Sequence, residues 1–125
     1  MKKILFFLFL SLSAFLNANE KNNKLVDLLH SFGNNGEYAQ MDSVYNLIIH
    51  EDHYKQDKLY ALNITLDYAR FLNQKGDSER ANTLLTQIRE SAIALEKFPE
   101  NTMAHQLQEI AAIATYEIAY GQWQN

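Results

Sequence analysis

Apolar residues along this chain recur every three or four positions, which is the spacing of one face of an α-helix. Long runs of alternating apolar and polar positions, the pattern of a half-buried strand, are missing. The pattern therefore predicts an all-helical domain. Five helices are expected after residue 18, at residues 22–33, 37–51, 56–75, from Asp77 or Ser78 to Phe98-Pro99, and from Asn101 or Thr102 to Gly121.

The pattern is most regular over residues 62–88. One apolar stripe ends at Gly76, and a second begins directly after Asp77. Glycine readily takes the left-handed backbone conformation that ends a helix, and aspartate caps the start of the next one. Ala69 and Ala81 are small and occupy positions at which the two helices would touch. This stretch is therefore predicted to be a hairpin of two closely packed antiparallel helices.

The third and fifth predicted helices differ in the width of their apolar faces. The third has a broad face, which suggests that other helices cover it on two sides. The fifth has a narrower stripe rich in alanine, which allows a neighbouring helix to approach closely. That stripe is predicted to consist of Met103, Leu107, Ile110, Ala111, Ala114 and Ile118.

A glycine follows an amphipathic helix at three places in the chain. The junctions are Gly36-Glu37, Gly76-Asp77 and Gly121-Gln122, and the glycines are 40 and then 45 residues apart. Sequence periods of this size are typical of stacked helical pairs. The recurrence therefore predicts two and a half copies of one helical unit, with the best-preserved copy in the middle.

The residues around these junctions resemble the tetratricopeptide repeat. In the central unit, Tyr68-Ala69 match the family's pair of an apolar and a small residue, and Leu72 matches its next core position. Gly76-Asp77 match its turn, and Ala81 and Leu85 match its second helix. The first unit matches at Leu25, Leu28, Phe32, Gly36-Glu37-Tyr38 and Tyr45, and the third at Ile110, Ile113, Ala114 and Gly121-Gln122-Trp123. The resemblance implies a short right-handed solenoid of stacked hairpins that binds a protein or peptide.

The resemblance has departures, because the family period is 34 residues and the offsets here are longer. Longer central helices and the link at residues 98–102 would absorb the difference. The alternative is an irregular helical bundle whose helices end at glycines.

The N-terminus has the organisation of a secretory signal peptide. Lys2 and Lys3 precede an apolar run at residues 4–16, and Ala18 follows as a small residue before the cleavage point. The run is shorter than the roughly 20 residues of a membrane span, which makes an uncleaved anchor the alternative interpretation. We therefore divide the chain into a signal peptide at 1–18 and a helical repeat domain at 19–125, and we expect a secreted or periplasmic protein.

The charge of the chain excludes several classes of partner. Its net charge is -4, and loss of the signal peptide with Lys2 and Lys3 changes this to -6. Nucleic acids and anionic membrane surfaces attract basic proteins, so neither is an expected partner after cleavage. The chain has no cysteine. The domain is therefore expected to fold without disulfides and to carry no lipid anchor on a cysteine.

The densest group of potential metal ligands is His50 and His53, with Glu51 and Asp52 between them. Two histidines three positions apart could share a divalent ion such as zinc. The alternative is a solvated loop between two helices, which fits the absence of an HExxH pattern and of cysteines. Since neither a nucleophile motif nor a phosphate loop is present, we expect no catalytic, cofactor-binding or metal-binding residues and no enzymatic activity.

A polar strip on the third predicted helix is the candidate binding surface. It lies opposite the apolar line of that helix and consists of Asn63, Asp67, Arg70 and Gln74. In tetratricopeptide repeat proteins the first helix of each pair lines the concave groove, so the resemblance places this strip in a groove for a protein or peptide partner. The alternative is a merely solvated helix face.

Two functions follow from these features. The first is an exported, non-enzymatic interaction module or scaffold. The second is an extracytoplasmic sensing or regulatory input module of a bacterial signalling protein, because the chain stops inside a repeat motif as if a continuation were missing. In either case the end of the stack after Trp123 could pair with a second copy to form a homodimer.

Replacement of Ala81 by leucine tests the predicted close packing in the central hairpin. The larger side chain should overpack the helix contact and lower the free energy of unfolding by about 1–3 kcal/mol. A thermal melt measures the change, and an unchanged melting temperature would contradict this hairpin.

Overall fold

The computed structural model describes residues 18–97 and 103–124, and side chains from Asn23 onward. These residues form helices and no strands, which confirms the all-helical prediction. The helices are α2 (Ala18–Asn34), α3 (Tyr38–Ile49), α4 (Asp52–Gln56), α5 (Lys58–Lys75), α6 (Ser78–Glu96) and α7 (Ala104–Gln124). The predicted signal peptide, apart from Ala18, and the predicted helix boundaries at Phe98-Pro99 and at Asn101 or Thr102 lie outside the described residues.

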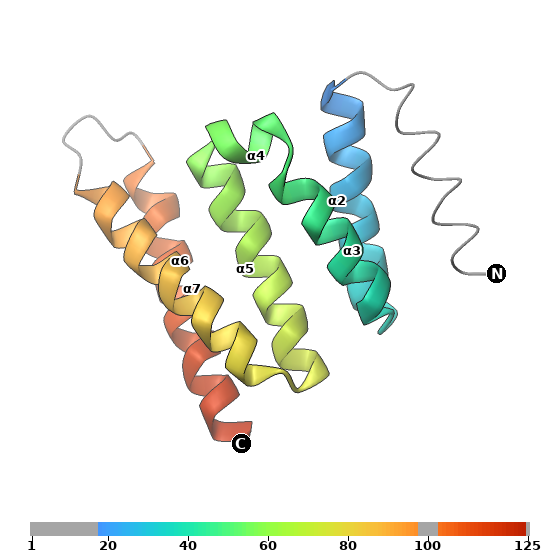
Figure 1. The fold of residues 1–125 in the computed structure, drawn as a ribbon. Helices are drawn as coiled ribbons and strands as arrows, with labels where there is room; N and C mark the ends of the chain where they lie inside the picture. The colour runs from blue at the N-terminus through green and yellow to red at the C-terminus, as the bar shows by residue number, and fades with distance from the viewer. Residues whose placement is uncertain (1–17, 98–102, 125) are drawn as a thin grey trace. The chain divides into compact units, whose positions relative to one another are not determined.

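The chain divides into two compact units, Met1–Gln56 and Asp57–Asn125. In the first unit α2 and α3 form an antiparallel hairpin (Figure 1). Its buried apolar side chains come from both helices at helical spacing: Leu25, Leu29, Met41, Val44 and Ile48. These positions recur every three or four residues, so each helix buries one continuous apolar face.

The second unit contains α5, α6 and α7, and each of these helices contacts the other two (Figure 1). Its fully buried small residues include Ala69 on α5, Ala81 on α6 and Ala114 on α7. Small side chains at helix contacts allow the backbones to come close. The broad face predicted for this stretch of α5 is confirmed, because its buried residues extend from Ile64 to Asn73 around much of the helix.

The two hairpins close with the same turn. Gly36 and Gly76 have positive φ angles of 73° and 94°. In the first turn Gly36 N–H donates to the Gly33 carbonyl and Glu37 N–H to the Phe32 carbonyl, and in the second Gly76 N–H donates to Asn73 and Asp77 N–H to Leu72. This pair of bonds is the Schellman motif, which satisfies carbonyls that a helix end otherwise leaves unpaired.

The connection predicted at residues 50–53 is partly helical. α3 ends at Ile49, and α4 begins at Asp52. The Asp52 carboxylate lies in the first turn of α4, where its negative charge interacts favourably with the helix dipole. Asp57 then caps α5 by accepting a hydrogen bond from Tyr60 N–H at 3.0 Å. α5 therefore begins two residues later than its predicted start.

The third predicted glycine junction is wrong. α7 continues through Gly121 to Gln124, and Gly121 does not have a positive φ angle. Met103, predicted as a buried residue, is 41% exposed and precedes α7. The physical reason for a glycine at position 121 lies in the contact between α7 and α5 described below.

No helix in residues 18–97 and 103–124 combines the length and the hydropathy that crossing a bilayer requires.

Substitution of Gly76 by alanine isolates the cost of its backbone conformation. A Cβ atom at this position would have no atom within 4 Å, so no side-chain collision contributes. The left-handed conformation costs an ordinary L-residue roughly 1–2 kcal/mol, and alanine should lower the stability by that amount. Asn tolerates this conformation better, so Gly76→Asn should lose less than Gly76→Ala in a urea unfolding titration. Equal losses for both variants would contradict this explanation.

Candidate functional site

The four predicted binding residues lie along α5, but they are not equivalent. Asn63 and Gln74 are exposed, and the Asn63 amide donates to its own helix at the Leu59 carbonyl, 3.1 Å away. Asp67 is half-buried and has interactions of its own. Arg70 is half-exposed and forms a contact with α7. The structure therefore leaves the two amides most accessible and ties Arg70 into the unit.

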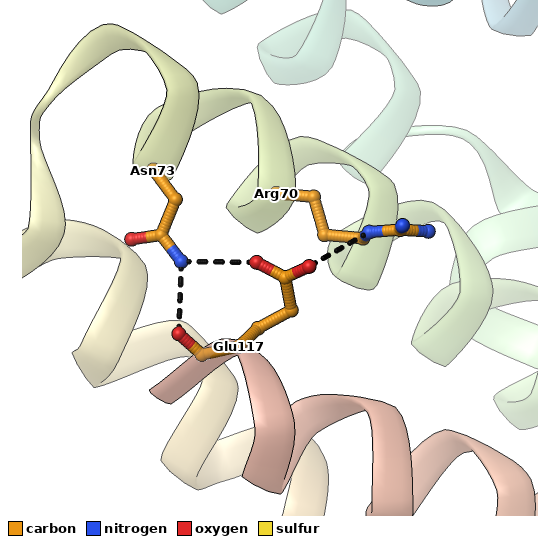
Figure 2. A network of polar contacts seen from close by, with 3 residues as sticks. All are labelled: Arg70, Asn73 and Glu117. Carbon is orange, nitrogen blue, oxygen red and sulfur yellow. Dashed lines mark hydrogen bonds and ion pairs between the residues drawn. The ribbon is translucent and has the colours of Figure 1, made fainter. Parts of the chain in front are cut away.

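Arg70 and Asn73 on α5 both bind Glu117 on α7 (Figure 2). The Arg70 Nε donates to Glu117 Oε1 at 3.2 Å, and the Asn73 Nδ2 donates to Glu117 Oε2 at 3.2 Å. The same Nδ2 donates to the Glu117 backbone carbonyl at 3.0 Å. We call these three residues the α5–α7 polar cluster.

Two members of the polar cluster, Asn73 and Glu117, are shielded from water. Asn73 is 2% exposed, and the Glu117 side chain is 10% exposed. A buried carboxylate is costly unless charged or polar donors satisfy it, and both of its oxygens have donors here. The cluster therefore gives α5 and α7 one preferred register, because sliding either helix would leave the carboxylate unsatisfied.

Gly121 lies directly beside this cluster. A Cβ atom at position 121 would stand 2.9 Å from Asn73 Oδ1, closer than real Cβ contacts allow. Asn73 cannot easily move away, because two hydrogen bonds hold its amide nitrogen. Its Oδ1 has no hydrogen-bond partner among the described residues. Gly121 is therefore explained by close approach of the two helices and not by a turn.

The terminal amino groups of Arg70 remain available on the outer side of the cluster. Figure 2 shows them on the side of the guanidinium group away from Glu117. The Arg70 side chain is 51% exposed, and its described contacts all run through Nε. Glu117 thus holds the guanidinium in place while its outer edge keeps two donors for an external carbonyl or carboxylate.

Tyr68 illustrates how a tyrosine of the central unit is used in the core. It is 2% exposed, and its hydroxyl accepts a hydrogen bond from Arg80 Nη2 at 2.8 Å. The Arg80 guanidinium also lies over the ring, 5.9 Å from its centre. This tyrosine serves the packing of α5 against α6, as its place in the predicted apolar-small pair implies.

Three aromatic residues of α7 behave in the opposite way. Tyr116, Tyr120 and Trp123 are 65%, 38% and 83% exposed. Their spacing of four and three residues places them on one face of the helix. The rings of Tyr116 and Tyr120 are stacked, 6.4 Å apart, and the Tyr120 hydroxyl accepts a hydrogen bond from Gln124 at 2.8 Å. We call these three residues the α7 aromatic strip.

The helix around the strip carries no exposed charge. Between Ile110 and Gln124 the only charged residue is Glu117, which is buried and bound to Arg70. Large exposed apolar side chains without charge are unusual on a monomeric protein surface when they are contiguous, and they mark interaction sites. The strip therefore has the composition of an interface core, which is rich in Tyr and Trp and poor in charge.

The histidine pair does not form a visible ligand cluster. His50 ends α3 and bonds through Nδ1 to the Asn46 carbonyl at 2.6 Å, whereas His53 lies in α4. Among the described residues, no three potential metal ligands lie together.

Asn73 and Glu117 were not predicted from the sequence as site residues, and neither was the exposure of the aromatic strip. A signal for Glu117 was present, because an acidic residue three positions after Ala114 interrupts the apolar line of α7. The sequence placed Tyr68 in the core pair of the central unit and left Tyr116 off the predicted stripe of the fifth helix, but it did not indicate that Trp123 is exposed.

Comparisons of this chain with protein families, curated proteins and solved structures found no match.

The collision between Gly121 and Asn73 can be tested by a double-mutant cycle. In the natural background Gly121→Ala should cost about 1–3 kcal/mol, because the new methyl group overpacks the contact. In an Asn73→Ala background the same change should be neutral or stabilising by up to about 1 kcal/mol, since alanine is the better helix former. Chemical unfolding of the four proteins measures the coupling free energy, and additive effects would exclude this contact.

Proposed function

We propose that this chain is a non-enzymatic interaction module, exported from its cell, that binds a protein or peptide partner through its second unit. The observation that carries the proposal is the exposed, uncharged α7 aromatic strip. Exposed tyrosine and tryptophan side chains offer large contact areas at low entropic cost, and they are the residues most enriched at the centres of protein interfaces.

The polar strip on α5 is the second part of the proposed surface. Asn63 and Gln74 present exposed amides, and Arg70 presents the outer edge of a guanidinium group that Glu117 orients. Amides and guanidinium groups can bond the backbone of an extended peptide. The α5 strip would then supply hydrogen bonds, while the α7 aromatic strip would supply most of the apolar contact.

A repeat architecture of tetratricopeptide type is the proposed framework. The two hairpins α2–α3 and α5–α6 share the same Schellman turn at glycines 40 residues apart. α7 contacts both α5 and α6, as the first helix of a following repeat would. These features support the repeat interpretation, although Gly121 no longer counts as its third junction.

Affinity capture tests the proposed function and separates its two surfaces. The immobilised protein is incubated with an extract of the cell that produces it, and bound proteins are identified. Trp123→Ala should abolish most of the capture, because a central aromatic anchor of an interface typically contributes about 2 kcal/mol or more. Asn63→Ala and Gln74→Ala should reduce capture more weakly, since each removes one exposed hydrogen-bonding group.

The matched control is Gln87→Ala, which changes an exposed amide on α6, a helix that contributes to neither strip. Its capture should equal that of the natural protein. If the natural protein retains no partner and shows no self-association, the proposed function is wrong. If Asn63→Ala and Gln74→Ala leave capture unchanged, the α5 strip is only a solvated helix face.

A further inference from the structure

We infer that the α7 aromatic strip is covered by the same strip of a second copy of this chain, with the two α7 helices antiparallel. This inference rests on the proposed function, and it names the partner at that surface. Three observations favour a second copy: the distribution of large and small exposed residues along the face, the absence of charge, and the hydrogen bonds that Thr115 and Tyr120 already make within α7.

The exposed face of α7 carries mostly small residues toward its N-terminal end and large ones toward its C-terminal end. Besides the three aromatic residues, this face carries Ala112, Thr115 and Ala119, which are all exposed. With 100° of rotation per residue, the six positions share one side of the helix. In one antiparallel register Trp123 lies opposite Ala112, Tyr120 opposite Thr115, and Tyr116 opposite Ala119. Each layer then holds one large and one small side chain, so the face is complementary to itself.

The charge distribution also permits two copies to meet here. The chain is acidic overall, with a net charge of -4, so two copies repel wherever exposed acidic side chains come together. The six positions of this face include none. The nearest exposed carboxylate on the helix, Glu109, precedes Ala112 and lies outside the paired positions. A partner recognised by opposite charge would find nothing to bind on the strip.

The polar atoms beside the strip are already bonded within α7. The Thr115 hydroxyl donates to the Ala111 carbonyl at 2.9 Å, and the Tyr120 hydroxyl accepts from Gln124 at 2.8 Å. Each of these hydroxyls therefore keeps one hydrogen bond within its own helix when the face is covered. The contact is small, because the exposed parts of the three aromatic residues amount to roughly 300–450 Å² per copy. A standard interface buries about 800 Å² per partner, so the dimer is expected to be weak and reversible.

Sedimentation velocity of the full chain tests for the dimer. The protein is produced with residues 1–18 present, so that the cell processes it as it does the natural protein. The dimer fraction should rise with concentration between about 10 μM and 1 mM, the range expected for a small interface. In this register the two copies of residue 116 lie about 4.5 Å apart along the axis, so Tyr116→Glu brings like charges together, whereas Trp123→Glu replaces a ring by a charge opposite the apolar Ala112. Each change should raise the dissociation constant at least about tenfold. Gln87→Glu adds the same charge on α6 and should leave the dimer unchanged.

Cysteine crosslinking tests the antiparallel register, and the chain contains no cysteine to interfere. In this register the two copies of residue 119 lie about 4.5 Å apart along the helix axis, and the two copies of residue 112 about 16 Å apart. A thiol crosslinker that spans about 8 Å, or one and a half helical turns, should therefore join copies of Ala119→Cys but not copies of Ala112→Cys. Equal crosslinking of the two variants would overturn the register.

The results also separate this inference from the proposed function. Circular dichroism and thermal melts confirm that each variant is folded, which is expected because Tyr116 and Trp123 are mostly exposed. A protein that stays monomeric at all concentrations overturns the second-copy inference. If Trp123→Glu then still loses a captured foreign protein, the proposed function stands. If capture is also unaffected by Trp123→Glu, both the inference and the assignment of the strip as a binding surface are wrong.

Discussion

The second unit depends on one buried carboxylate. Glu117 lies on the inward face of α7, where only donors from α5 can satisfy it, and Arg70 and Asn73 provide them. Residues three or four positions apart share one face of a helix. When Glu117 points inward, Ala114 and Gly121 therefore also point inward, and the aromatic strip lies on the outer side. The same constraint brings the helices so close that residue 121 has no room for a Cβ atom. The polar contact thus agrees with the burial of Leu107, Ile110 and Ala114 about which face of α7 points inward.

The two kinds of glycine in this chain meet different physical demands. Gly36 and Gly76 adopt a left-handed backbone conformation and end helices, whereas Gly121 stays helical and makes room for Asn73. In the sequence all three follow an amphipathic segment and precede a polar residue. Only Gly36 and Gly76 close hairpins, and Gly121 lies within the following helix α7.

The two surfaces of the second unit offer different kinds of contact to a partner. The α5 strip offers hydrogen-bonding groups that are exposed or oriented by Glu117, and the α7 aromatic strip offers uncharged apolar area. Because Arg70 takes part in both the polar cluster and the α5 strip, a substitution there changes stability and surface chemistry together. Asn63 and Gln74 report on the surface alone, and this makes them the better sites at which to test binding.

The sequence by itself determined the local structure. Periodicity located all the described helices except the short α4 to within a few residues. Glycine followed by an acidic residue identified both hairpin turns, because helix caps are encoded by neighbours along the chain. It also indicated that Ala69 and Ala81 are buried, since small residues on an apolar stripe are typical of helix contacts. The tertiary structure alone decided that Glu117 is buried, that Gly121 is not a turn, and that Trp123 is exposed. These outcomes depend on which residues of α5 face α7, and that pairing joins positions more than forty residues apart that no local pattern relates.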